Sequence, residues 1–244
     1  FFPEAPPDKR AITLEQLLTH TSGIVENYAA DGITERDAAV QAIFAQPLGT
    51  PGEFHYTNDS YVLLGAVVEV ASGEPLETFF SEQLFQPAGL RDSGFWGFVD
   101  IDDATRFAHI QGDIPQERRL ANWGDRAASG VISTAGDLYR WWRALQTDRV
   151  LPRQSVQDLF APRVNTESGT QIAAGWYWTR TARDTRALWT RGTEDFGHNA
   201  LLLSWIDEGF TLAMTTNAGE IDGEGWNKRM PAEVEAILWP GTAP

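Results

Sequence analysis

PGEFHYTN (residues 51–58) is the stretch that decides the fold, and it leads into a strongly apolar run over residues 61–71. The Pro- and Gly-rich segment 47–52 just before it predicts a turn. A helix formed by this run would be apolar on nearly every side, which predicts a buried helix that ends at Gly73. Tyr56 and Asn58 therefore stand at the entrance to a buried helix.

Helix signals flank this stretch on both sides. Thr13 and Gln16 form a capping-box pattern, after which Leu14, Leu17 and Leu18 share one face and Gly23 can end the helix. The region 91–128 shows no period and is expected to be a long loop of the kind that carries or covers a site. Further helices are expected from Thr34-x-x-Asp37, from Pro75, from Thr134-x-x-Asp137 and over residues 231–238.

From about residue 171 the spacing of apolar residues changes from that of helices to that of strands. Strands are expected over residues 172–179, 187–190, 199–206 and 210–216, and Asp207-Glu208-Gly209 makes the last two a hairpin. Helices first and antiparallel strands last predict an α+β fold. We expect a mainly helical subdomain with the Tyr-x-Asn element over residues 1–165, and strands with a terminal helix over residues 166–244.

Composition excludes several kinds of function. The formal net charge is −15, which argues against binding to nucleic acid or to anionic membranes. The chain has no cysteine, so disulfides and thiolate sites are excluded, and no apolar run is long enough to span a membrane. Ten tryptophans predict large core side chains, with an aromatic-lined cleft as the alternative.

Four motifs in order carry a family resemblance. ITLEQLLTHTSG (residues 12–23) resembles the "LLTHTSG" signature of serine β-lactamase-like proteins, and residues 51–58 resemble their "PGxxFxYSN" element. ASGVISTAGDL (residues 128–138) resembles "AxGGLxSTAxDLxRW", and residues 215–217 resemble the closing "LTN". The chain is thus similar to the β-lactamase-like and penicillin-binding-protein-like superfamily, in the class C β-lactamase, esterase and D-peptidase branch.

The resemblance implies a serine hydrolase that works through an acyl-enzyme. It implies that Tyr56 is the general base and later the proton donor to the leaving group, and that Asn58 hydrogen-bonds a lysine and the substrate. The alternative is a tyrosine that only caps the helix that begins near Tyr61. No cofactor is implied, and the family favours a periplasmic or secreted location. The implied fold is an antiparallel sheet flanked by helices, with a helical subdomain.

The family's substrate-binding strand element departs from its usual form here. Lys-Thr-Gly or His-x-Gly would fall at Trp189-Thr190-Arg191, where only Thr190 matches. Two interpretations of Arg191 stay open: it pairs with a substrate carboxylate, or it is a solvated arginine on an acidic protein. The altered element favours esterase or peptidase activity over β-lactam hydrolysis.

The nucleophile motif Ser-x-x-Lys is missing, because the only lysines are Lys9 and Lys228 and neither follows a serine at that spacing. The chain is either the C-terminal portion of an enzyme or a non-catalytic ligand-binding or scaffold relative. In the first case the N-terminal strands and nucleophile helix lie outside it. The expected partners are a small ester, amide or peptide substrate and an N-terminal segment or second chain with Ser-x-x-Lys. Residues 1–244 are not expected to fold alone as a complete catalytic domain.

Other polar residues are weaker candidates. His20 is expected to hydrogen-bond local backbone, and Ser22 lacks the setting of a nucleophile elbow. The acidic cluster of Asp100, Asp102 and Asp103 is expected to be a solvated loop, and no spacing predicts a metal site.

Overall fold

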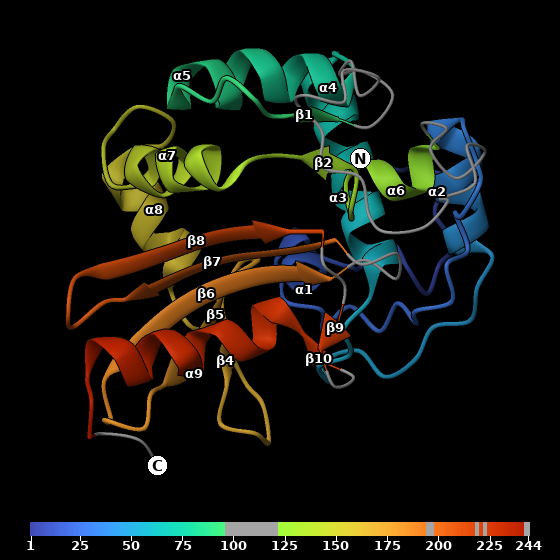
Figure 1. The fold of residues 1–244 in the computed structure, drawn as a ribbon. Helices are drawn as coiled ribbons and strands as arrows, with labels where there is room; N and C mark the ends of the chain where they lie inside the picture. Colours follow the sequence, from blue (N-terminus) through green and yellow to red (C-terminus); the bar gives the residue numbers. More distant parts are fainter. Residues whose placement is uncertain (96–121, 194–197, 218–219, 222–223, 242–244) are drawn as a thin grey trace.

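A six-stranded antiparallel sheet forms the C-terminal part of the protein. The computed structural model describes residues 1–95, 122–193, 198–217, 220–221 and 224–241 (Figure 1). Its strand order, β3-β4-β5-β6-β7-β8, follows the chain, so each strand pairs with the next. The strands are β3 (Val164–Asn165), β4 (Gln171–Ile172), β5 (Tyr177–Arg180), β6 (Arg186–Thr193), β7 (Asn199–Trp205) and β8 (Phe210–Thr216).

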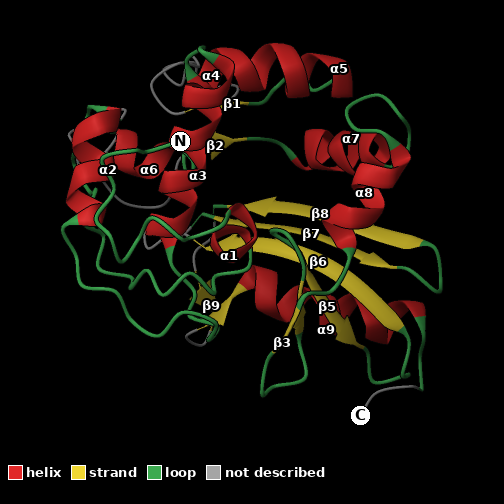
Figure 2. Cartoon of the chain, turned by 180° about the vertical axis from the view of Figure 1, so that it is seen from behind, coloured by secondary structure: helices red, strands yellow, loops and turns green. Residues whose placement is uncertain are grey.

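Helices cover both faces of this sheet. α7 (Ala135–Leu145) and α8 (Arg153–Phe160) lie on one face, and α9 (Trp226–Leu238) lies on the other (Figures 1 and 2). Successive residues of β7 point to opposite faces, so Leu202 packs in the cluster that includes α7, and Leu201 packs in the cluster that includes α9. Both faces of the central strands are therefore buried.

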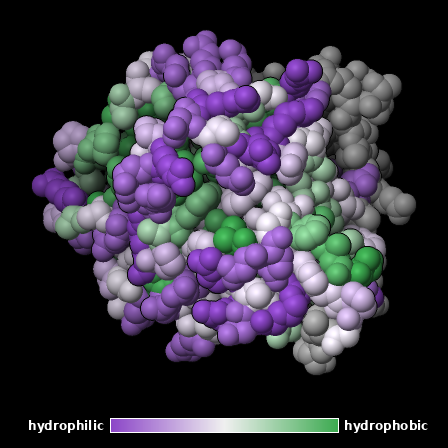
Figure 3. Space-filling model, turned by 90° about the vertical axis from the view of Figure 1, so that its left-hand side faces the viewer, coloured by the Kyte–Doolittle hydropathy of each residue, from purple (hydrophilic) through white to green (hydrophobic). Residues whose placement is uncertain are grey.

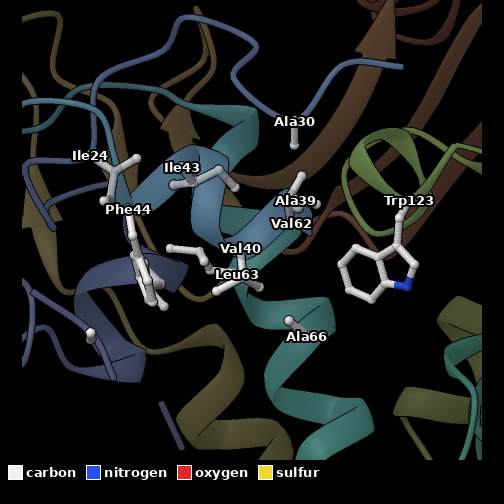
Figure 4. Close-up of a cluster of buried hydrophobic side chains, with 12 residues drawn as sticks. Ile24, Ala30, Ala39, Val40, Ile43, Phe44, Val62, Leu63, Ala66 and Trp123 are labelled. Atoms are coloured by element: carbon white, nitrogen blue, oxygen red, sulfur yellow. The ribbon is translucent and has the colours of Figure 1, made fainter. Parts of the chain in front are cut away.

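A helical part packs around α3 (Asn58–Ser72). Ten labelled side chains of its core appear in Figure 4, where α2 and α3 face each other and Trp123 closes one end. Gly65 of α3 is required here, since a Cβ on it would lie 2.4 Å from the Ala127 Cβ. The other helices of this part are α1 (Leu14–Leu18), α2 (Arg36–Phe44), α4 (Leu76–Phe79), the π-helical turn η1 (Phe80–Phe85), α5 (Gln86–Ala88) and α6 (Trp123–Arg126).

The described residues also form two small two-stranded sheets. β1 (Gly94–Phe95) pairs with β2 (Val131–Ile132), and β9 (Glu220–Ile221) pairs with β10 (Glu224–Gly225). The expected long loop over residues 91–128 therefore contains β1 and α6 among its described residues. The acidic cluster at Asp100, Asp102 and Asp103 lies outside the described residues.

Several sequence predictions are confirmed. Thr13 and Gln16 form the capping box, Thr134 accepts a hydrogen bond from the Asp137 N–H, and Gly73 ends α3 in the left-handed region at φ 74°. The hairpin turn before β8 is also present, since the Gly209 N–H donates to the Trp205 carbonyl at 2.9 Å. The expected α+β arrangement, an antiparallel sheet flanked by helices, is also present.

Other boundaries differ from prediction. α1 ends at Leu18, because His20, not Gly23, first takes a positive φ. α2 starts after Glu35, with no side-chain cap from Thr34. The single strand expected over residues 172–179 is two strands, since Gly175 turns the chain at φ 75°.

Two helices also differ. α8 was not predicted, and α9 begins five residues before Pro231, so that proline lies inside the helix. The sheet begins at Val164, two residues before the expected start of the strand-rich part.

The surface agrees with the acidic, polar composition. In the face shown in Figure 3, apolar side chains gather in small patches between hydrophilic ones. Among the described residues no helix has the length and hydrophobicity needed to cross a membrane.

Candidate active site

The Tyr56 segment is held in place by the residues that follow α1. The N–H groups of Gly49, Gly52 and His55 donate to the carbonyls of Gly23, Thr21 and His20 at 2.7–2.8 Å. Two sequence motifs about 30 residues apart are thus joined into one rigid unit.

Gly23 permits this close approach. It has φ 80°, and a Cβ on it would lie 3.1 Å from the Pro51 nitrogen and 3.3 Å from the Gly49 carbonyl oxygen. A larger residue would push the two motifs apart. The glycine of the Thr-Ser-Gly motif therefore has a packing role.

Tyr56 and Asn58 are in direct contact. The Tyr56 hydroxyl donates to Asn58 Oδ1 at 3.2 Å, and the Asn58 backbone N–H donates to the Glu26 carboxylate. Tyr56 is 56% exposed, so its hydroxyl is accessible. Partial burial raises the pKa of the Tyr56 phenol, and nearby Glu26 and Tyr28 raise it further. Tyr56 in this setting is therefore a protonated phenol at neutral pH.

A small acidic cavity lies beside Asn58. Its volume is about 70 Å³. Asp59 in its wall is only 2% exposed, and its burial, together with the nearby Glu26, raises the pKa of its carboxyl to about 6. The cavity is lined by Tyr28, Ala30, Asp31, Asn58, Asp59, Gly124, Asp125, Ala128 and Ser129.

The other wall of the site comes from β5 and β6. Tyr177 stacks on Trp189 with ring centres 4.6 Å apart, and the Arg191 guanidinium carbon lies 4.7 Å from the centre of the Trp189 ring. Thr190, between Trp189 and Arg191 in the strand, points to the opposite face of the sheet. The three residues of the predicted element therefore do not share one surface.

Tyr177 connects this wall to Tyr56. Burial raises the pKa of Tyr177 to about 12, the neighbouring Tyr56 also raises it, and Arg191 lowers it. Tyr177 thus lies close enough to Tyr56 and Arg191 for both of them to affect its own pKa. Sequence reasoning did not select Tyr177, although it stands opposite Trp189 in the β5–β6 register.

The remaining candidates have structural roles in the described part of the chain. Ser22 is fully buried; its hydroxyl lies 3.3 Å from that of Ser60 and accepts the Ile24 N–H. His20 bonds backbone as expected, but that of Thr57, 37 residues away. No group of three or more His, Asp or Glu side chains among the described residues could hold a metal ion.

Comparison with known proteins identifies the family. The family model described as Beta-lactamase matches residues 2–231. The chain belongs to the Beta-lactamase family. This family membership confirms the resemblance of the four motifs.

Relatives of this Beta-lactamase family chain include several named proteins. It is 28% identical over 181 residues to the putative penicillin-binding protein PbpX of Bacillus subtilis, covering 70% of this chain and 45% of PbpX. It is 28% identical over 176 residues to the D-alanyl-D-alanine-carboxypeptidase/endopeptidase AmpH of Escherichia coli, covering 63% of this chain and 43% of AmpH. The chain therefore spans less than half the length of these curated relatives.

Solved structures show the same fold. The D-amino acid amidase of Ochrobactrum anthropi SV3 superposes with a TM-score of 0.77 at 21% identity, covering 98% of this chain and 75% of that protein. At this identity the likeness concerns the fold alone. Nearly all of this chain thus has a counterpart in a β-lactamase-like fold.

Proposed function

We propose that this chain supplies the proton-transfer and substrate-binding part of a serine hydrolase that acts on esters, amides or D-amino-acid peptides. The observation that carries the proposal is the Tyr56–Asn58 pair at 3.2 Å, accessible to solvent and held by the Thr-His-Thr-Ser-Gly segment. Family membership and a relative named as a D-alanyl-D-alanine carboxypeptidase support this substrate class.

The proposed nucleophile is the serine of a Ser-x-x-Lys motif in an N-terminal segment or second chain. The serine oxygen bonds to the substrate carbonyl carbon while its proton passes to the phenolate oxygen of Tyr56, which the lysine of Ser-x-x-Lys stabilises in its deprotonated form. Tyr56 then gives a proton to the leaving group, and water hydrolyses the acyl-enzyme. Backbone N–H groups near Thr190 on β6 contribute to the oxyanion hole.

The electrostatics of Tyr56 make a neighbouring cation necessary. Its phenol has a raised pKa, so it is a poor base by itself. An ammonium group close to the phenol oxygen lowers the pKa by stabilising the phenolate. The lysine of Ser-x-x-Lys is the proposed source of this charge, since both lysines of residues 1–244 lie in other sequence contexts.

Trp189 and Arg191 are the proposed substrate-binding side chains, with Thr190 contributing through the strand backbone. Relatives named penicillin-binding proteins and the family resemblance also support a proposed periplasmic or secreted location. The altered Trp189-Thr190-Arg191 element favours ester or peptide substrates over β-lactams.

A fluorophosphonate probe tests the proposed function on the complete protein. We expect a stable phosphonyl adduct on the serine of Ser-x-x-Lys, located by mass spectrometry of peptides. An unlabelled, correctly folded complete protein supports the alternative, a non-catalytic relative that binds ligands through the same cleft. That alternative is favoured only by the absence of Ser-x-x-Lys from these 244 residues.

A further inference from the structure

His20 occupies an unusual position behind Tyr56. It is 3% exposed and has φ 56°, a left-handed conformation that is uncommon for residues other than glycine. Its carbonyl accepts the His55 N–H at 2.8 Å, and its ring Nδ1 accepts the Thr57 N–H at 3.2 Å. One residue thus holds the backbone on both sides of Tyr56.

The His20 ring also packs against the rings of Tyr56, Tyr61 and Phe54. Its centre is 4.5 Å from that of Tyr56, at an interplanar angle of 37°. The ring centres of His20 and Tyr61 lie 5.1 Å apart, at an interplanar angle of 31°. Tyr61 is itself fixed, because its hydroxyl donates to the Leu18 carbonyl at 3.1 Å. His20 therefore contacts both the anchored Tyr61 ring and the Tyr56 ring.

The bonding of His20 fixes its chemical state. Because Nδ1 accepts a hydrogen bond, the neutral ring carries its proton on Nε2. Burial lowers the pKa of His20 to about 4, so the ring stays neutral at the pH at which hydrolases of this kind work. A neutral, hydrogen-bonded imidazole keeps the same charge and the same orientation next to the Tyr56 ring.

Tyr56 needs such a support because its own side chain is more than half exposed. An exposed phenol can adopt several side-chain rotamers unless neighbouring groups hold it. Among the described residues, the His20 ring and the Asn58 side chain are the contacts that orient the Tyr56 side chain. Asn58 holds the hydroxyl, and His20 holds the ring plane.

We propose that His20 is a positioning residue that sets the orientation of the Tyr56 phenol for proton transfer. The inference rests on the proposed function, in which Tyr56 exchanges protons with the nucleophilic serine. His20 acts through Tyr56 and through the Thr57 backbone, and it does not touch the substrate. A displacement of about 1 Å of a proton-transfer group can lower the rate by roughly 100-fold.

The test replaces the ring but keeps a hydrogen-bond acceptor. His20→Asn places an amide oxygen near the site of Nδ1, and Asn tolerates a positive φ, so the Thr57 bond can survive while the stack is lost. His55→Asn is the matched control, since His55 is exposed in the same segment. Both variants are made in the complete protein.

The first readout is ¹⁹F NMR of 3-fluorotyrosine protein, with the Tyr56 signal assigned by its loss in Tyr56→Phe. We expect His20→Asn to move the Tyr56 signal and its pH midpoint, while the signal of Tyr139, on α7, reports an intact fold. In His55→Asn the Tyr56 signal stays in place. An unchanged Tyr56 signal and midpoint in His20→Asn overturns the proposal, whether or not the protein hydrolyses any substrate.

The second readout is steady-state kinetics on an ester substrate. We expect His20→Asn to lower kcat by roughly tenfold or more while KM changes by less than about twofold, because ring orientation affects the transition state and not substrate binding. A wild-type kcat in His20→Asn contradicts the proposal. An inactive wild-type protein that no fluorophosphonate labels rejects the proposed function, and the ¹⁹F result then decides the positioning role independently.

A measurement on the unaltered protein covers the case in which His20→Asn does not fold. ¹⁵N NMR of the histidine ring is expected to show a neutral His20 with its proton on Nε2 at pH 7. A His20 ring with its proton on Nδ1 excludes the Thr57 bond and overturns the proposal.

Discussion

Tyr56 is surrounded by groups that favour its protonated form. Glu26 lies within hydrogen-bond reach of the Asn58 backbone, and its charge raises the pKa of the Tyr56 phenol. Asp59, one residue further along α3, adds a second acidic group in a buried position. At the scale of single residues, the site is therefore acidic. An added cation would offset the negative charges that raise the pKa of the Tyr56 phenol.

Asp59 gives a pH-dependent prediction. Its folded-state pKa of about 6 lies above the ordinary value of 3.8, so between these pH values the folded protein binds more protons than the unfolded protein. The free energy of unfolding therefore falls as pH rises through that window. We expect Asp59→Asn to raise this free energy by about 1–3 kcal/mol at pH 7, and by almost nothing near pH 4.

Urea unfolding of the complete protein between pH 4 and 8 measures this difference. Asp31→Asn is the control, because Asp31 lines the same cavity but is exposed, and its effect should stay within about 0.5 kcal/mol. A destabilised Asp59→Asn at pH 7 would show that the ionised carboxylate is needed for folding.

Arg191 gives a second residue-scale prediction. Its guanidinium lies against Trp189 near Tyr177, and we propose that it pairs with a substrate carboxylate there. We expect Arg191→Ala to raise KM roughly tenfold or more for substrates with a free carboxylate and to leave neutral esters almost unchanged. Arg180→Ala, an exposed arginine at the end of β5, is the control. Equal effects on charged and neutral substrates would remove the carboxylate role.

At the scale of elements, a polar cluster around Arg183 and Glu235 joins α9 to the sheet. Arg183, in the β5–β6 turn, pairs with Glu208 at 2.6 Å and with Glu235 of α9 at 3.2 Å. Glu235 also accepts the indole N–H of the buried Trp205 at 2.6 Å, and Arg183 lies 3.7 Å from the centre of the Trp239 ring. Glu235 therefore accepts hydrogen bonds from two donors, the indole N–H of Trp205 and an N–H of the Arg183 guanidinium.

Removing Glu235 should be costly for this reason. We expect Glu235→Ala to lower the free energy of unfolding by about 2–3 kcal/mol, because it leaves the Trp205 N–H without an acceptor and weakens the hold on Arg183. Glu233→Ala, which removes an exposed partner of Arg229 on the same helix, should change it by less than about 0.5 kcal/mol. Chemical denaturation distinguishes the two, and equal effects would contradict the assigned role of Glu235.

Elements with strong local signals could be predicted from the sequence, and those shaped by tertiary contacts could not. The alternation of apolar and polar residues over 210–216, with the turn at Gly209, correctly predicted β8. Gly73 correctly predicted the end of α3. α8 was missed because its apolar residues, Val156, Leu159 and Phe160, cover only two turns. The helix is held by packing of Phe160 against Trp142 and Trp176.

The same limit applies to the candidate site. Tyr56 and Asn58 were found because their motif is local in sequence. Tyr177 and the stacking role of His20 depend on contacts between residues far apart in the chain, which no local pattern reveals. The expected strand over residues 187–190 stops before Arg191, and the pairing with β7 extends β6 to Thr193, so that Thr190 points away from both neighbours.

At the scale of the whole molecule, β8 is an edge strand that pairs only with β7 in the described sheet. Its sequence FTLAMTT has no charge and no proline, the features by which proteins usually protect an edge. We propose that a strand from outside residues 1–244 pairs with it. Residues 1–244 produced alone should then self-associate in size-exclusion chromatography. A monodisperse monomer that melts cooperatively would contradict this proposal.

The most direct test of the central claim is the rate at which fluorophosphonate reacts with the complete protein when Tyr56 is changed. The account predicts that Tyr56→Phe slows phosphonylation of the Ser-x-x-Lys serine by roughly 100-fold or more, because the serine proton loses its acceptor. Tyr139→Phe, a change at an exposed tyrosine of α7, should react like the wild type. Wild-type reactivity in a folded Tyr56→Phe protein would contradict the account.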